Sequence, residues 1–221
     1  MILELYIGCI NMLKIGIIDM ALCYIIGKRA RWYQLHCLIN TIVVIEIFPT
    51  IIDMIINMEN GYKNIENNNL SNYIIFLHIY HILTFKNLNK YDYFHHIIFV
   101  GLGIIPTLGY IKSSQIYFHK LACSGIPGII EYGSLTLYKN NLISKYNQKL
   151  LNIILYTYVR LPLCIFGITM NYIAYMNGYI EDNLIITIYI NLLLYLNGTI
   201  FTQLTNYSYY KLINDNIEIN Q

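Results

Sequence analysis

The chain has 221 residues, of which 57% are hydrophobic and only 12% are charged, with a formal net charge of +2. A soluble domain usually carries about 25% charged residues, so this chain has too few charges to cover a water-facing surface. Its hydrophobic residues recur in blocks along the whole length, which is typical of a protein that crosses a membrane several times. The small net charge and the lack of a long basic block argue against nucleic acid as a partner.

Seven of these blocks approach the length of about 20 mostly apolar residues that a membrane-spanning helix needs. We therefore expect an all-α transmembrane helix bundle of about seven spans, or six if the first block, which contains Lys14 and Asp19, does not cross. The linkers between the blocks are short and polar, so residues 1–221 are expected to form a single integral membrane domain. In chain order, the blocks are residues 3–26, 37–58, 71–86, 93–111, 114–138, 150–176 and 184–206.

Lysine and arginine predict the orientation of the bundle, because cytoplasmic loops carry an excess of these residues. With the N-terminus outside, nine basic residues fall in inside loops and three in outside loops, so we predict an N-out, C-in topology. The inside set is Lys28, Arg29, Arg31, Lys86, Lys90, Lys139, Lys145, Lys149 and Lys211, and the outside set is Lys63, Lys112 and Lys120. The sequon that begins at Asn69 then lies on the lumenal side, where Asn69 is a candidate for N-glycosylation.

The fourth block begins with an aspartate and two adjacent histidines, Asp92, His95 and His96. Their spacing of three and four residues places the carboxylate on the same side of a helix as both rings. A carboxylate that orients an imidazole creates a general base or acid, so these three residues are catalytic candidates. The alternative is the start of a helix at the membrane interface, with Asp92 near its N-cap and two hydrated histidines, and the spacing alone leaves both open.

Other ionisable residues lie within the predicted spans, where they usually face the bundle interior or a water-filled cavity. His78 and His81 share one helix face and fit metal ligands, a proton relay or interior polar contacts. Glu131 and Arg160 carry opposite charges in adjacent blocks, so we expect a structural ion pair. The stretch "SGIPG", residues 124–128, predicts a helix break just before Glu131 and therefore a cavity at that depth.

Two patches of the chain resemble the TLC-domain superfamily, which includes the ceramide synthases. The first is "KYDYFHHIIF", residues 90–99, and the second runs from "EYGS" through "YVRLP", residues 131–162. In the second patch, the matching positions are Glu131, Ser134, Asn152 and Arg160. A TLC-like core would cover roughly residues 34–210. The resemblance is to a divergent branch, because His119 is followed by Lys120 where the ceramide synthases have an aspartate.

The resemblance implies a multi-pass protein of an endoplasmic-reticulum-type membrane that binds, senses or handles lipid acyl chains in a polar-lined cavity. Its partners would be membrane lipids, it would need no resident cofactor or metal, and a homo-oligomer is compatible with the pattern. In the catalytic members, the resemblance implies N-acylation of a long-chain base, with acyl-CoA as co-substrate and His95 and His96 as the acid–base pair. The resemblance leaves lipid binding and N-acyl transfer as alternatives.

Two other classes of membrane protein are also helical bundles. A metal-dependent membrane oxygenase would use His78, His81, His95 and His96 as ligands, but such enzymes usually contain more histidines than the six found here. An opsin-type receptor needs a lysine in its last span for the Schiff base, and residues 184–206 contain none. The oxygenase is therefore a remote alternative, and the missing lysine argues against opsin photochemistry.

Overall fold

The computed structural model describes most of the chain as a bundle of helices. The residues that it describes are 2–63, 69–85, 93, 95–104, 111 and 113–219. Side chains are not described for residues 2–7, 69–72, 95, 99, 102–104 and 216–219. Over this part of the chain there are helices and turns but no strand, so the prediction of an all-α fold is confirmed.

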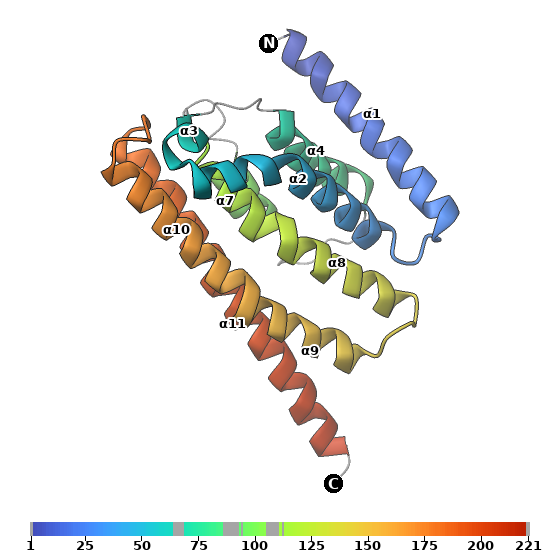
Figure 1. Cartoon of the computed structure of the whole chain (residues 1–221). Helices are drawn as coiled ribbons and strands as arrows, with labels where there is room; N and C mark the ends of the chain where they lie inside the picture. The colour runs from blue at the N-terminus through green and yellow to red at the C-terminus, as the bar shows by residue number, and fades with distance from the viewer. Residues whose placement is uncertain are drawn as a thin grey trace.

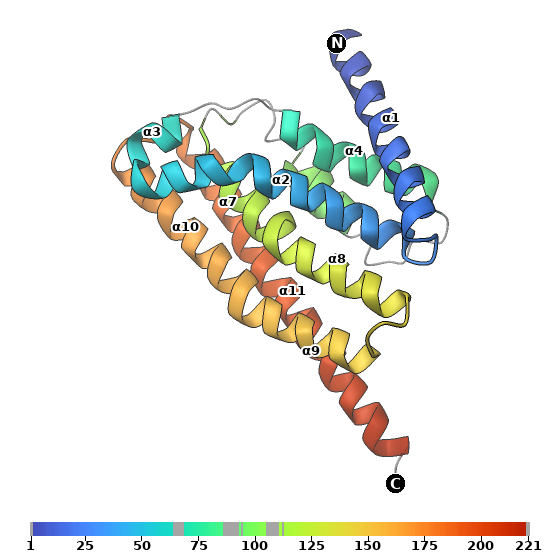
Figure 2. The same ribbon diagram turned by 45° about the vertical axis from the view of Figure 1, so that its right-hand side comes forward.

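The N-terminal half of the bundle consists of α1 (Ile2–Ile25), α2 (Arg31–Ile56), α3 (Met58–Lys63) and α4 (Asn69–Thr84). Helix α1 lies at the edge of the molecule and contacts α4 and α2 (Figures 1 and 2). It ends at a turn in which Gly27 has a φ of +109°, a conformation that favours glycine. The turn lets α2 run back across the bundle.

A π-helical segment, η1 (His95–Ile104), follows α4 in the described part of the chain. A second rod then combines α7 (Ile116–His119), the π-helical η2 (Lys120–Gly125) and α8 (Ile126–Lys139). The kink or interruption expected at residues 124–128 takes the form of an irregularity: the helix is not interrupted, but a π-helical turn ends at Gly125, whose ψ of −110° is not helical. Pro127 lies in the first turn of α8, where its missing N–H is tolerated, and the π-helical turn absorbs the irregularity.

The C-terminal half consists of one long rod and one long helix. The rod contains α9 (Lys145–Leu155), the π-helical η3 (Tyr156–Arg160) and α10 (Leu161–Met176), and the helix is α11 (Leu184–Ile219). Both α9 and α10 contact α11, and the C-terminal turns of α11 extend beyond the rest of the bundle (Figures 1 and 2).

Four helices in the described part of the chain are long and apolar enough to cross a membrane, which is consistent with a membrane protein. They are Gly8–Ile25, Arg31–Ile56, Lys145–Met176 and Leu184–Asp215. Each of the seven predicted blocks contains described helix, but α4 has only 16 residues and α7–α8 is less apolar. Seven spans and the N-out, C-in orientation therefore stay predictions.

Aspartate 19, which made the first block doubtful as a span, is fully buried and paired. Its Oδ2 accepts a hydrogen bond of 2.7 Å from Nε of Arg31 and one of 2.6 Å from the hydroxyl of Tyr80. Nη2 of Arg31 bonds the same oxygen. This network joins α1, α2 and α4. It also explains why α2 begins at residue 31 rather than at 37, since the charge of Arg31 is neutralised within the fold.

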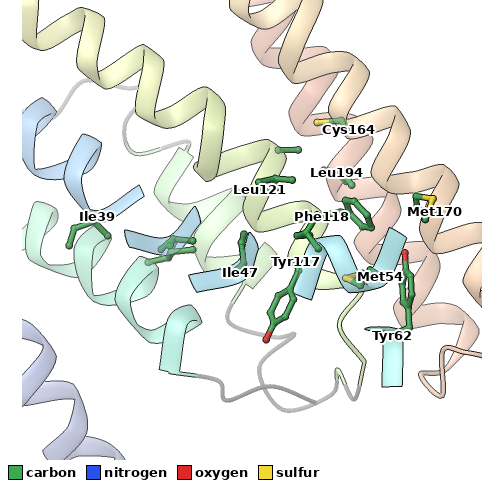
Figure 3. Close-up of a cluster of buried hydrophobic side chains, with 14 of the residues drawn as sticks. Ile39, Ile47, Met54, Tyr62, Tyr117, Phe118, Leu121, Cys164, Met170 and Leu194 are labelled. Atoms are coloured by element: carbon green, nitrogen blue, oxygen red, sulfur yellow. The ribbon is translucent and has the colours of Figure 1, made fainter. Parts of the chain in front are cut away.

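One cluster of buried hydrophobic side chains joins α2 to α7, α10 and α11 (Figure 3). Ile39, Ile47 and Met54 of α2, Phe118 of α7 and Leu194 of α11 all belong to it, with Ile39 at one end of the cluster and Met54 nearer to Phe118. Close packing of this kind, rather than the hydrophobic effect alone, holds helices together in a bilayer. The core fixes the angle at which α2 passes the rods that supply the site described next.

Candidate functional site

A polar cavity of about 170 Å³ lies between helices from both halves of the bundle. Helix α2 contributes His36 and Asn40 to its wall, and α4 contributes His78. Helix α8 adds Glu131, and η3 adds Arg160. Further lining residues are Cys123, Ser124, Gly128, Tyr132, Tyr156 and Phe201. The cavity that the sequence predicts near Glu131 is thus present in the structure.

Arg160 is buried at this cavity and is held by neutral partners. Its Nη2 donates to the side-chain oxygen of Asn197 on α11. Its guanidinium also lies 4.7 Å from the ring centre of Tyr156 and 5.0 Å from that of Phe201, at cation–π distances. These contacts fix the guanidinium at the cavity wall.

Glu131 accepts a hydrogen bond from the hydroxyl of Tyr156 through its Oε2. The ion pairs found among the described residues join Arg31 to Asp19 and Lys63 to Glu59, and none joins Glu131 to Arg160. The expected direct ion pair is therefore wrong. Each charge is bonded to a neutral neighbour instead, and the two side chains face one cavity.

Two buried donors at this cavity have no hydrogen-bond partner within the described part of the chain, Nδ2 of Asn40 and Nε of Arg160. Both residues line the cavity and are at least 96% buried. Gly128 makes room for the amide, because a Cβ atom there would lie within 3.0 Å of Nδ2 of Asn40. A buried donor without an acceptor is destabilising by about 1–3 kcal/mol, so such atoms point to a bound acceptor.

A cluster of histidine rings adjoins the cavity on the side of α4. Nε2 of His96 lies 3.0 Å from Nδ1 of His81, so one ring donates to the other. The ring of His78 is 5.0 Å from that of His96, and Nδ1 of His78 donates to the carbonyl of Ile74 at 2.6 Å. Trp32 stacks on His81 with ring centres 3.3 Å apart. All three histidines are buried, so the cluster is an interior feature of the bundle.

His36 connects this cluster to the cavity. Its ring stacks on Tyr132 with centres 4.3 Å apart and meets the ring of His78 at 5.4 Å. His36 is not among the site residues that the sequence predicts. Asn40, one turn along the same helix, was also missed, and its only signal was a polar residue inside an apolar block.

The predicted catalytic residues are only partly described. Asp92 lies outside the described residues, and the side chain of His95 is not described, although its backbone belongs to η1. His96 is buried against His78 and His81, which does not fit a hydrated interfacial histidine. The catalytic arrangement of the three residues therefore stays a prediction.

Three other predicted site residues, Ser134, His81 and Asn69, are not among the residues that line the cavity. Ser134 is not among the cavity-lining residues, because its hydroxyl donates to the carbonyl of Glu131 at 2.7 Å and contacts Asn152 at 3.3 Å, which ties α8 to α9. His81 belongs to the histidine cluster and not to the cavity wall. Asn69 is the first residue of α4, and its side chain is not described, so N-glycosylation stays a prediction.

Among the described residues, no group of three or more His, Cys, Asp or Glu side chains is arranged to hold a metal ion. Because the side chain of His95 is not described, the oxygenase alternative stays a remote prediction.

Two π-helical turns contribute to the cavity wall, and a third contributes to the adjoining histidine cluster. Segment η2 supplies Cys123 and Ser124, η3 supplies Tyr156 and Arg160, and η1 supplies His96. Such turns are rare in α-helices and occur frequently at functional sites. The presence of several such turns near one cavity distinguishes it from an ordinary packing defect.

A second buried polar cluster, at the other end of α10, offers a contrast. The side-chain oxygen of Asn171 accepts from the hydroxyl of Tyr62 at 2.9 Å, and its Nδ2 donates to Asn191 at 2.9 Å and to the carbonyl of Gln115 at 3.4 Å. Asn171 is completely buried, and both of its polar atoms are bonded. It therefore has a structural role, unlike Asn40.

No protein-family model matches the chain, and no curated protein and no solved structure is significantly similar to it. The resemblance to TLC-domain proteins thus rests on the two short patches in the sequence. Membership of that superfamily stays a prediction.

Proposed function

We propose that this chain is an integral membrane protein that binds the polar head of a membrane lipid in the cavity between His36 and Arg160. The observation that carries the proposal is the pair of unpartnered buried donors, on Asn40 and Arg160, in a cavity between helices of which several are long and apolar enough to cross a membrane. Ionisable residues at membrane depth are rare and usually mark a substrate or ion site. The TLC-like patches support the same assignment.

The size of the cavity limits which part of a lipid it takes. A water molecule occupies about 30 Å³ in the liquid, and drug-sized ligands need pockets of about 300–1,000 Å³. A cavity of about 170 Å³ holds a small head group but no long acyl chain. The head is therefore bound inside the bundle, while the chains stay among the apolar side chains and lipids outside.

The charges limit the chemistry of the head group. The free N–H groups of Asn40 and Arg160 require acceptor oxygens, whereas the carboxyl group of Glu131 opposes a second negative charge in the same cavity. A head that combines a carbonyl or hydroxyl oxygen with an amine or amide N–H meets both demands. Amino alcohols and their N-acyl derivatives have this combination.

The experiment that tests this proposal is a comparison of co-purified lipids. The full-length protein is purified in mild detergent, and the bound lipids are identified by mass spectrometry. In Asn40→Ala, one lipid class falls roughly five-fold, since a hydrogen bond contributes about 1 kcal/mol. Asn171→Ala, a buried asparagine in the structural cluster, retains that lipid. Equal lipid content in the two variants contradicts the proposal.

A second candidate function is N-acyl transfer, favoured by the hydrogen bond between His81 and His96. In this reaction the amine of a long-chain base attacks the thioester carbonyl of acyl-CoA, the carbon–sulfur bond breaks, and the CoA thiol leaves. His96 accepts the proton that the amine loses and passes it to the thiolate. The histidine pair adjoins the cavity through His78, close to where the amine would lie.

Lipidomics separates the two functions. Membranes that contain equal amounts of folded wild type or His95→Ala/His96→Ala are compared for N-acylated lipids. A product that accumulates with the wild type and not with the variant supports transfer. Unchanged profiles, together with lipid loss in Asn40→Ala, leave binding as the function. An endoplasmic-reticulum-type location, which the resemblance implies, is tested by co-localisation with a marker of that membrane.

A further inference from the structure

A second pocket, of about 520 Å³, lies at the turn between α1 and α2. It is lined by Met20, Cys23 and Tyr24 of α1, by Lys28 of the turn and by Arg31, the first residue of α2. None of these residues lines the histidine-bordered cavity, so the two pockets are separate. The proposed function does not use this pocket.

Side-chain contacts give the turn a defined conformation. Nε2 of Gln34, a buried residue of α2, donates to the carbonyl of Gly27 at 3.0 Å. The backbone N–H of Arg31 donates to the carbonyl of Lys28 at 3.4 Å. With Gly27 in its positive-φ conformation, these bonds hold Lys28 on the wall of the pocket.

Arg31 is held in place while part of its guanidinium stays open. Nε and Nη2 bond to Asp19, and Nη2 also donates to the hydroxyl of Tyr80 at 3.2 Å. The ring of Phe85 lies 5.0 Å from its central carbon. Nη1 takes part in none of these bonds, and the side chain is 35% exposed. Arg31 is therefore a pre-positioned donor at the pocket, with little entropy left to lose on binding.

The turn between α1 and α2 carries a net positive charge. Three basic residues, Lys28, Arg29 and Arg31, lie within four positions, and Asp19 offsets one of them. Lys28 is exposed, and its ammonium group forms no ion pair within the described part of the chain. The positive end of the α2 dipole points to the same turn and adds to the attraction for an anion.

An exposed apolar stripe leads away from this charge along α1. Leu13, Ile17, Met20 and Tyr24 are each more than half exposed. Their spacing of four, three and four residues puts them on one helix face. Met20 and Tyr24 belong both to the stripe and to the pocket, so the site is basic at one end and apolar along its length.

We propose that this pocket binds the phosphate of an anionic membrane phospholipid, with Lys28 and Arg31 on the phosphate and an acyl chain along the stripe of α1. Basic side chains next to a membrane-spanning helix bind anionic head groups, and tyrosine is enriched at that depth. A free phosphate would use the same cations. Only a lipid can also contact the apolar stripe with an acyl chain. We therefore assign the phosphate to a lipid rather than to free inorganic phosphate.

The test measures lipid binding to the full-length protein by native mass spectrometry in detergent. Phosphatidylglycerol is titrated, phosphatidylcholine serves as the neutral lipid, and inorganic phosphate serves as the competitor. Lys28→Ala is compared with Arg29→Ala, which removes the same charge from the same turn at a position outside the pocket wall. Both positions are exposed, so neither substitution disturbs the core.

Phosphatidylglycerol is expected to bind the wild type more tightly than phosphatidylcholine does. Lys28→Ala weakens its binding about five-fold, equivalent to about 1 kcal/mol, whereas Arg29→Ala changes it less than about two-fold. Equal weakening in the two variants overturns the proposal, because it indicates diffuse attraction to the whole turn. Equal affinity for the two lipids also overturns it. Displacement of the lipid by millimolar inorganic phosphate overturns the assignment to a lipid.

Discussion

Removal of the buried carboxylate in α1 tests whether a polar network, rather than apolar packing, attaches this helix to the bundle. In Asp19→Ala, Arg31 and Tyr80 both lose their shared acceptor. Breaking a fully buried ion pair from one side is destabilising by about 3–5 kcal/mol. The side chain of Arg31 is 35% exposed and can turn to water, so we expect the lower end, about 3 kcal/mol.

The assay is thermal unfolding of the detergent-solubilised protein, in which about 3 kcal/mol corresponds to a decrease in Tm of roughly 6–12 °C for a chain of this size. The double variant Asp19→Ala/Arg31→Met recovers most of this loss, because no uncompensated charge then remains. Tm losses that simply add, so that the double variant is less stable than either single variant, would refute the reasoning. Additive decreases in Tm would mean that the two residues stabilise the bundle independently.

Three further substitutions test the cavity and the rod beside it, each by thermal unfolding in detergent. Gly128→Ala lowers stability by about 1–3 kcal/mol and reduces bound lipid, since the new methyl group displaces the amide of Asn40. Ser144→Ala costs about 1 kcal/mol, because Ser144 is the N-cap of α9 and accepts a bond from the backbone N–H three residues on. Tyr156→Phe lowers stability by about 1–3 kcal/mol, because the partly buried carboxyl group of Glu131 loses its donor.

Matched variants control these measurements. Gly133→Ala, on the same helix as Gly128, should be nearly neutral, because a Cβ there has only the sulfur of Cys37 near it, at 3.7 Å. Ser144→Asp retains an N-cap acceptor and should keep wild-type stability. Tyr158→Phe alters a side chain that is 74% exposed and should not change Tm. A control as damaging as its test variant would show that the named contact is not the cause.

The sequence predicts the helices well where the apolar blocks are continuous. The limits of α11 and of the α9–α10 rod differ from the prediction mainly at their more polar ends, where the chain stays helical beyond the continuous apolar block. Helix α2 begins six residues before its predicted block, because Arg31 and Gln34 are polar but are bonded within the fold. A prediction from hydropathy assigns such polar residues to a loop.

The candidate site could be predicted only in part. The opposite charges of Glu131 and Arg160 predicted interior positions and an ion pair, since an ionisable residue in an apolar helix faces the interior; both residues line the cavity, but they form no direct pair. Their partners were not predicted, because Tyr156 and Asn197 are neutral residues whose proximity depends on how η3 packs against α11. Asn40 is a similar case, since its role depends on the absence of a side chain at Gly128 on another helix.

The π-helical turn at Tyr156–Arg160 has a consequence for insertions and deletions. Such a turn accommodates one extra residue without ending the helix, and each residue of an α-helix turns the chain by about 100°. Deleting one residue there would leave composition, hydropathy and helix length almost unchanged, yet it would rotate all of α9 relative to α10. The number of residues in this segment therefore determines which face of the rod carries Arg160, whatever the identity of those residues.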